Sequence, residues 1–154
     1  MLSTGFPRAD VENDFLRARR RQFLGALTHR LRGGRGEDNR LVRLDDVVAP
    51  LCWRGQRQLG LQTIPVDAIV GTTGARRDFD RHFRPTSTRV RYRWERVALA
   101  VRRGEAIPPI EVYRVADRHF VSDGHHRVSI AAATRQCMID AYVTQVLTAV
   151  PPGS

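Results

Sequence analysis

The stretch PPIEVYRVADRHFVSDGHHRVSIAAATRQCMIDAYVTQV, residues 108–146, has a pattern that predicts a hairpin, a helix and a further strand. Residues 108–122 form two short apolar runs around an Ala-Asp-Arg turn, which is typical of a β-hairpin. Gly124 then interrupts the chain, apolar residues in 126–136 recur at helical spacing, and 138–146 reads as another strand.

Upstream of this stretch, residues 61–71 read as a strand that runs into a turn, and 72–85 read as a polar loop. A hydroxyl side chain within 86–88 can cap the helix that follows, and Gly104 would end it. The apolar stripe of that helix is Val90, Trp94, Val97, Ala98 and Val101. The order strand, helix, hairpin, helix, strand predicts an α+β fold, with a small mixed sheet and flanking helices.

Residues 1–60 are predicted to form a helical N-terminal extension to a domain that spans 61–150. Asp10 can cap a first helix, which the glycine-rich segment 33–40 would end as a flexible linker. A short strand or turn and a short helix are expected within 41–54. The apolar residues at roughly helical spacing are Val11, Phe15, Ala18, Phe23, Leu27 and Leu31. We expect this helix to pack Phe15, Phe23 and Leu27 on the sheet of the domain.

The length and composition indicate one domain with a hydrophobic core. The chain has 154 residues, of which 42% are hydrophobic. No apolar run reaches the roughly 18 residues that a membrane-spanning helix needs, and the N-terminus has no apolar segment typical of a signal peptide. Cys52 and Cys137 lie far apart, which predicts a reducing cytoplasmic location, no membrane and no zinc site.

All 26 basic residues are arginine, and the formal net charge is +10. Such a charge favours polyanionic partners, which include DNA and nucleotides. The arginines are spread along the whole chain rather than gathered in a basic tail. A solvated arginine-rich surface is therefore the alternative interpretation.

Residues 122–127, SDGHHR, contain the densest group of side chains that could act in catalysis or ligand binding. Gly124 lies where a strand turns into a helix, and the backbone N–H groups at a helix start point outward without partners. Together with the helix dipole they form an anion site, which a glycine leaves open to close approach. His125, His126 and Arg127 add donors, so the turn predicts phosphate binding.

Two carboxylates could serve the same site. Asp123 could hold Mg²⁺ or accept a proton, and Glu111 on the preceding strand could face the same cleft. Three other interpretations remain open for the turn. It could be a transition-metal site of His125, His126 and Asp123, a serine nucleophile with a histidine base, or a polar turn with a purely structural role.

The order of motifs in residues 61–147 resembles the N-terminal domain of the ParB/sulfiredoxin superfamily. The resemblance rests on six motifs of this sequence, in order. They are IPVDAIV, ARRDF, VALAVRRG, PPIEVYRV, GHHRVSIA and IDAYVTQV. The match covers a little over half of the chain, and the six motifs together are more specific than any one of them.

This resemblance implies a nucleotide ligand such as ATP or CTP, with Mg²⁺. Gly124, His125, His126 and Arg127 would then hold phosphates, and Arg76 or Arg77 would reach them from the loop. The turn is most similar to the Asp-Gly-His turn of free serine kinases, which favours phosphoryl transfer. In that reading Asp123 or Glu111 is the base, and His125 lies near the transferred phosphate.

The sequence also departs from the family. Sulfiredoxins carry a catalytic cysteine where this chain has His125, so sulfiredoxin activity is not expected. Partition proteins continue into a helix-turn-helix domain and a dimerisation domain, whereas this sequence ends at Ser154, so centromere-specific binding and a full clamp cycle are not expected.

Three functions follow as hypotheses. The first is a nucleotide-binding protein that hydrolyses a nucleoside triphosphate or transfers its phosphoryl group. The second is a DNA-binding module or nuclease that works through its arginines. The third is an antitoxin-like partner that docks through its N-terminal helix, and a homodimer is retained as one form of assembly.

Overall fold

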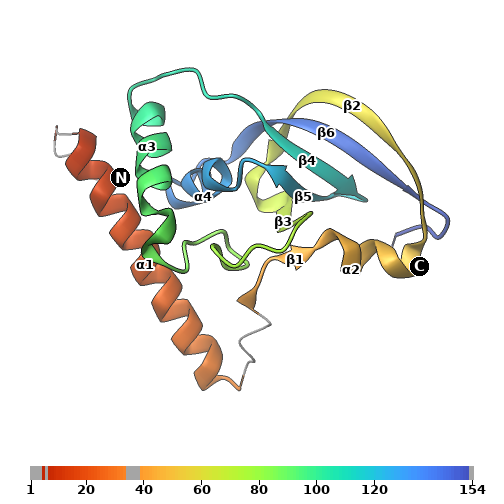
Figure 1. Cartoon of the computed structure of the whole chain (residues 1–154), viewed down its shortest axis with the longest axis horizontal. Coiled ribbons are helices and arrows are strands. Elements are labelled where there is room, and N and C mark those ends of the chain that lie inside the picture. The colour runs from red at the N-terminus through yellow and green to blue at the C-terminus, as the bar shows by residue number, and fades with distance from the viewer. Residues whose placement is uncertain (1–4, 6, 34–38, 153–154) are drawn as a thin grey trace.

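The computed structural model describes residues 5, 7–33 and 39–152, without the side chains of 29 and 30. It has an α+β fold in which helices flank a mixed six-stranded sheet (Figure 1). The strands are β1 (Val42–Arg43), β2 (Trp53–Pro65), β3 (Ile69–Thr72), β4 (Ile110–Val115), β5 (Arg118–Asp123) and β6 (Met138–Thr148). The helices are α1 (Pro7–Leu31), α2 (Leu44–Val48), α3 (Arg91–Arg102) and α4 (His125–Ala133), with short 3-10 turns η2 (Ala49–Leu51), η3 (Val66–Ala68) and η4 (Thr88–Val90).

The strand order is β1-β3-β5-β4-β6-β2. Strands β1, β3 and β5 run parallel to one another, β5 and β4 form the antiparallel hairpin, β4 and β6 are parallel, and β6 and β2 are antiparallel. The predicted hairpin, helix and closing strand are therefore confirmed, and they supply the centre of the sheet. The mixed sheet with flanking helices is confirmed as well.

The central strands of the sheet contribute to two cores, one on each face, because alternate residues of a strand point to opposite faces. Val121 of β5 lies in the larger core under α4, α3 and α1, whereas its neighbour Phe120 packs in a second core with α2. The side chains of β6 also point to both faces, so Val143 lies in the first core and Val146 in the second.

The helices on the first face are stacked: α4 packs on the sheet, α3 on α4, and α1 on α3. Trp94 of α3 is fully buried, as expected, and its Nε1–H donates to Ser129 Oγ of α4 at 2.9 Å. Phe15 of α1 meets the Trp94 ring edge-on, with centroids 5.5 Å apart. The predicted hydroxyl cap lies one turn earlier than α3: Ser87 Oγ accepts the N–H of Arg89 and caps the 3-10 turn η4, whereas α3 follows Val90 without a side-chain cap.

Helix α1 differs from its prediction in where it starts and what it packs against. It begins at Pro7, a residue suited to the first position of a helix, so Asp10 does not cap it. Asp10 instead lies buried in the first turn, 3.6 Å from Arg102 of α3. Asp14 pairs with the same guanidinium group at 2.6 Å, so Arg102 fastens α1 to α3.

The expectation that Phe23 and Leu27 pack on the sheet is wrong. Their side chains are 63% and 46% exposed on the part of α1 that extends past the body of the protein (Figure 1). The buried stripe Val11, Phe15 and Ala18 faces α3 rather than the sheet, and a helix of 3.6 residues per turn carries Phe23 off that stripe.

Strand β2 starts at Trp53, well before the strand that the sequence predicted from residue 61 and inside the stretch expected to be helical. It pairs with β6 along its whole length, from Trp53 opposite Thr148 to Pro65 opposite Met138. Two register irregularities and mostly exposed side chains hide the alternation that identifies a strand. Part of the predicted linker, 34–38, lies outside the described residues. None of the helices described is long and apolar enough to cross a membrane.

Candidate functional site

Gly124 links β5 to α4 as expected and adopts a left-handed conformation with φ 108°. The first intrahelical bond of α4 runs from Val128 N–H to Gly124 C=O at 3.0 Å. The N–H groups of residues 125–127 precede that bond, so they have no partner within the helix. The backbone half of the predicted anion site is therefore present.

The glycine also has a packing reason to be there. A Cβ at residue 124 would lie 2.5 Å from Ile110 Cγ2 and 2.9 Å from Ile110 Cβ, and Ile110 is fully buried. The space that would admit an anion on this side of Gly124 is occupied by the start of β4.

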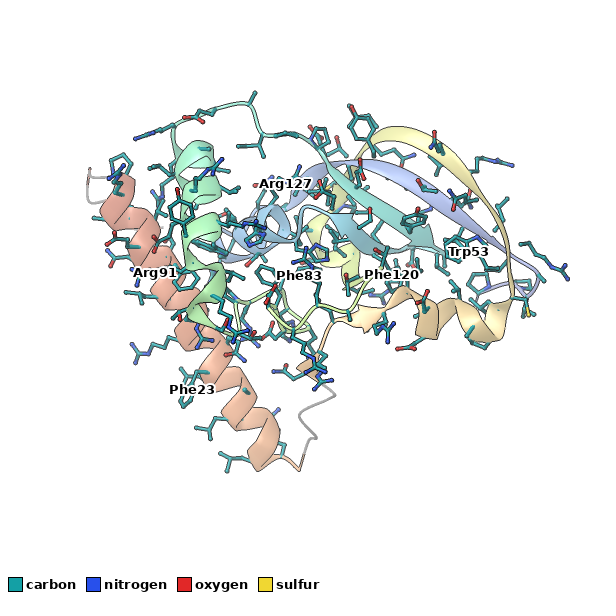
Figure 2. The ribbon with its side chains drawn as sticks, viewed as in Figure 1. Phe23, Trp53, Phe83, Arg91, Phe120 and Arg127 are labelled. Atoms are coloured by element: carbon teal, nitrogen blue, oxygen red, sulfur yellow. The ribbon has the colours of Figure 1, made fainter. Side chains whose placement is uncertain are left out.

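Arg127 is held by the protein itself (Figure 2). Its Nη1 donates to the carbonyl groups of Pro108 and Pro109 at 2.6 and 2.9 Å, and its Nη2 pairs with Asp123 Oδ2 at 2.7 Å. These contacts tie the segment before β4 to the first turn of α4. Arg127 thus has a structural role at the turn, and Asp123 is engaged in it.

His125 is buried to 97% and turned towards the end of β3. Its Nε2 lies 2.8 Å from Thr72 Oγ1, and its Nδ1 has no hydrogen-bond partner among the described residues. Burial, and then the charge of Arg76 and the neighbouring His126, lower the pKa of His125 to about 4. The ring is therefore neutral at neutral pH.

His126 points elsewhere, with its ring edge-on to Phe79 at 5.3 Å between centroids. Its Nε2 is buried and has no hydrogen-bond partner in the described part of the chain. Burial lowers the pKa of His126, and the charges of Arg76 and Arg93 lower it further. Two adjacent imidazoles thus each keep an unpaired buried nitrogen within the field of the same arginine.

Arg76 is the arginine that this arrangement brings close to both histidines. It is half-buried, and its one ion pair, with Asp78 at 3.4 Å, is long. Arg77 is exposed, and its carbonyl group accepts a hydrogen bond from the Thr86 hydroxyl. Of the two loop arginines that the family resemblance singled out, Arg76 is the one whose charge reaches the turn.

Glu111 lies directly opposite Asp123 in the β4–β5 register, so the two carboxylates are cross-strand neighbours. Both are exposed. Mg²⁺ commonly uses one or two carboxylates together with substrate phosphates, and this pair fits that requirement. The described residues include no group of three or more His, Cys, Asp or Glu side chains that could hold a metal ion by themselves.

The other interpretations of the turn can be compared with this geometry. The two imidazoles diverge, one towards Thr72 and the other towards Phe79, which does not suit a shared metal. Ser129 accepts the Trp94 N–H inside the core, and Ser122 donates to the Glu111 carbonyl group, so both serines have structural partners.

Sequence reasoning missed Thr72 and Arg93. Thr72 precedes its partner His125 by 53 positions and meets it only because β3 pairs in parallel with β5. The small polar run GTTG after a strand was the only signal for it.

A scan of protein-family models and a search of curated proteins returned no significant match to the chain.

Proposed function

We propose that this protein binds the phosphate groups of a nucleotide at the start of α4. The observation that carries the proposal is the pair of unpaired buried nitrogens, His125 Nδ1 and His126 Nε2, beside Arg76 and a helix N-terminus. Buried polar atoms normally have hydrogen-bond partners, so an orphaned pair in a positive field points to an anionic ligand.

The chemistry of binding follows from the same groups. A phosphate at the helix start would accept hydrogen bonds from the N–H groups of residues 125–127 and pair with Arg76. Its negative charge would raise the pKa of His125 and His126, so the imidazoles would become additional donors. Binding should therefore strengthen as the pH falls from 7 towards 6.

The finer features of the proposal come from the family resemblance. A ParB/sulfiredoxin-like domain would take ATP or CTP with Mg²⁺, which Asp123 and Glu111 would help to hold. Phosphoryl transfer or hydrolysis would need a free base, and Asp123 would have to leave Arg127 to act as one. We therefore propose nucleotide binding as the main function and phosphoryl transfer or hydrolysis as the secondary one.

Isothermal titration with ATP, CTP and ADP, with and without Mg²⁺, tests this function. Arg76→Gln should weaken nucleotide binding by tenfold or more, because it removes a charge beside the phosphates. Arg77→Gln is the matched control on the same loop and should change the affinity less than twofold. Failure of every nucleotide to bind, or an Arg76→Gln variant that binds as tightly as the parent, would contradict the proposal.

DNA binding is a second candidate, and the β2–β6 ribbon favours it. The long antiparallel pair continues beyond the part of β6 that β4 covers, and its exposed residues include Arg54 and Arg57 (Figure 1). A two-stranded ribbon fits the major groove, and arginines bind phosphates. Gel shifts over a salt series should show DNA affinity that falls steeply with salt and weakens in an Arg54→Gln, Arg57→Gln double variant.

A further inference from the structure

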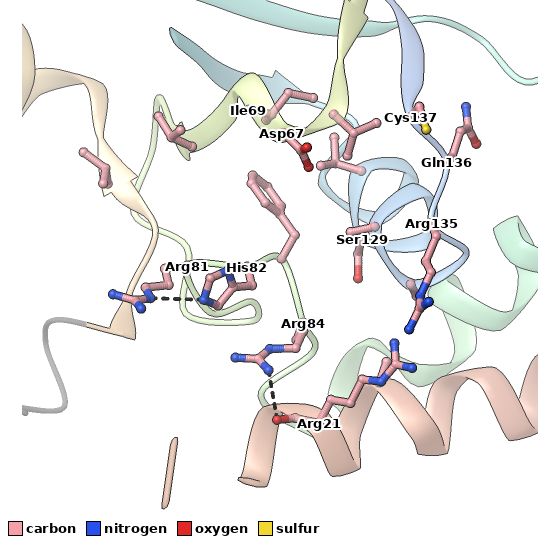
Figure 3. Close-up of a pocket in the computed structure, with 18 residues that line it drawn as sticks. Arg21, Asp67, Ile69, Arg81, His82, Arg84, Ser129, Arg135, Gln136 and Cys137 are labelled. Carbon is pink, nitrogen blue, oxygen red and sulfur yellow. Dashed lines mark hydrogen bonds between the residues drawn. The ribbon is translucent and has the colours of Figure 1, made fainter. Parts of the chain in front are cut away.

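A cavity of about 740 Å³ lies between α1, the loop at residues 81–84, η3 and the C-terminal half of α4 (Figure 3). Its volume is in the range of small-molecule sites. None of the residues assigned above to the nucleotide site lines it. The cavity therefore needs an explanation of its own.

Arginine dominates the polar part of this cavity. Arg21, Arg81, Arg84 and Arg135 line it, whereas Asp67 is the only acidic residue that does so among those the structure describes. Arg84 is already neutralised, because its Nε pairs with the buried Asp80 at 2.8 Å and its Nη1 donates to the Arg21 carbonyl group.

Arg21 and Arg135 are in a different situation. Figure 3 shows their guanidinium groups turned towards each other, one from α1 and one from the end of α4. No ion pair or side-chain hydrogen bond holds either guanidinium group within the described part of the chain. Both arginines are exposed, so water and salt screen their mutual repulsion. Among the described residues their guanidinium donors are free, and an anion between them could accept from both.

The backbone at Arg135 has an unusual conformation. Arg135 has φ 56°, a left-handed conformation that follows the last turn of α4 and that glycine usually occupies. A non-glycine residue there costs about 1–2 kcal/mol. The conformation ends α4, because the N–H groups of Arg135 and Gln136 return to the carbonyl groups of Ala132 and Ala131. This helix ending also places the Arg135 guanidinium group at the cavity.

The loop that carries the other arginines is rigidly built. Asp80 is 1% exposed, and its Oδ1 accepts the N–H groups of His82 and Arg84 at 2.8 and 3.0 Å. Phe83 between them is buried with φ 57° and faces the cavity. The buried carboxylate of Asp80 thus fixes the conformation of this loop.

Most of the remaining cavity wall is apolar, although His82, Ser129, Gln136 and Cys137 also line it. Val66, Ile69, Val128, Ala132 and Ala133 line it, and the two alanines of α4 leave room where larger side chains would fill it. A bare inorganic ion would leave this surface uncovered. An apolar body attached to an anionic group would cover it.

We propose that this cavity binds an amphipathic organic anion, with its apolar ring or chain on the alanine face of α4 and its carboxylate or phosphate between Arg21 and Arg135. This site is separate from the nucleotide site at the start of α4. It would allow a second, smaller ligand to bind the same domain.

The test uses the full chain and 1-naphthyl phosphate, titrated by calorimetry. It should bind with one-to-one stoichiometry and at least tenfold more tightly than inorganic phosphate or the uncharged 1-naphthalenemethanol. A parallel titration with 1-naphthoate shows whether carboxylate or phosphate is preferred. No binding of either naphthyl anion, or equal binding of the uncharged analogue, would overturn the proposal.

Variants then locate the ligand. Arg135→Gly removes the guanidinium group and also relieves the left-handed strain, so it should fold at least as well as the parent and bind the naphthyl anion tenfold or more weakly. Arg21→Gln should weaken binding similarly, whereas its exposed neighbour Arg20→Gln should change it less than twofold. If Arg20→Gln lowered the affinity for the naphthyl anion as much as Arg21→Gln does, the anion would be bound by net charge alone, and the proposed site would be overturned.

Arg76→Gln separates this proposal from the nucleotide site. It should leave naphthyl phosphate binding unchanged even if it abolishes nucleotide binding. A loss of naphthyl phosphate binding in Arg76→Gln would place the ligand at the start of α4 and overturn the second site.

Discussion

Replacement of Gly124 by alanine should destabilise the protein in two ways that can be separated. The new Cβ would lie 2.5 Å from Ile110 Cγ2, closer than real Cβ contacts allow, and the residue would keep φ near 108°. The left-handed conformation costs about 1–2 kcal/mol for a residue other than glycine. Overpacking of a core costs about 1–3 kcal/mol. The expected loss is therefore about 2–5 kcal/mol of the free energy of unfolding.

Gly104→Ala is the matched control for this experiment. Gly104 also has a left-handed conformation, with φ 69°, but a Cβ there would meet nothing within 4 Å. Its replacement should cost only the conformational part, about 1–2 kcal/mol. The difference between the two variants measures how tightly Ile110 closes against the turn.

Urea denaturation followed by tryptophan fluorescence gives both free energies. Adding Ile110→Ala to Gly124→Ala removes the Cγ2 contact, so the double variant should lose less stability than the sum of the single losses. A Gly124→Ala variant within about 0.5 kcal/mol of Gly104→Ala, the range of ordinary surface substitutions, would refute the packing account. It would leave the glycine explained by its left-handed conformation alone.

Three further predictions concern the core and its charges. His125 has a pKa of 6.5 in the unfolded chain and about 4 in the folded protein, so its contribution to stability is complete above pH 6.5. Between pH 6.5 and 4 the free energy of unfolding should fall by about 1.4 kcal/mol per pH unit. Urea denaturation at pH 7, 6 and 5 should show a smaller dependence of the free energy of unfolding on pH in His125→Asn. Ser129→Ala leaves the buried Trp94 N–H without its acceptor and should cost about 1–3 kcal/mol in urea denaturation, with a shift in tryptophan emission. On α1, Phe15→Ala should cost about 3–5 kcal/mol, whereas Phe23→Ala should change the unfolding midpoint little because its ring is 63% exposed.

The elements that sequence could predict are those set by neighbours along the chain. The β4–β5 hairpin and the α4 turn at Gly124 follow from alternation and a glycine within a few residues. The Ser87 cap and the buried Trp94 follow from local spacing in the same way.

The features that sequence did not reveal depend on partners far along the chain. Strand β2 is held by β6, not by its own pattern, and exposed residues such as Arg54 and Arg57 conceal its start. The partner of His125 is fixed by a parallel strand pair that no local pattern encodes. The cavity between Arg21 and Arg135 joins two segments more than a hundred residues apart.

At the candidate site, the sequence predicted which residues lie near the turn, but not which of their polar groups are already paired. Arg127 looked like the principal phosphate ligand because arginine suits that role. In the structure its donors are taken by Asp123 and two backbone carbonyl groups, whereas Arg76 has only a long ion pair with Asp78 among the described residues. Which donors are already occupied depends on tertiary contacts that composition cannot show.

The pairing of β2 with β6 has a consequence for how the chain is made. Strand β2 lies at the edge of the sheet, and β6, about eighty residues later, is its only strand neighbour in the described sheet. On a ribosome that adds roughly 5–20 residues per second, β2 waits several seconds with its backbone unpaired. Unpaired strands associate with one another, and charged residues within them suppress this. Arg54 and Arg57 place two exposed charges in β2, and such charges disfavour association of the unpaired strand before β6 has been synthesised.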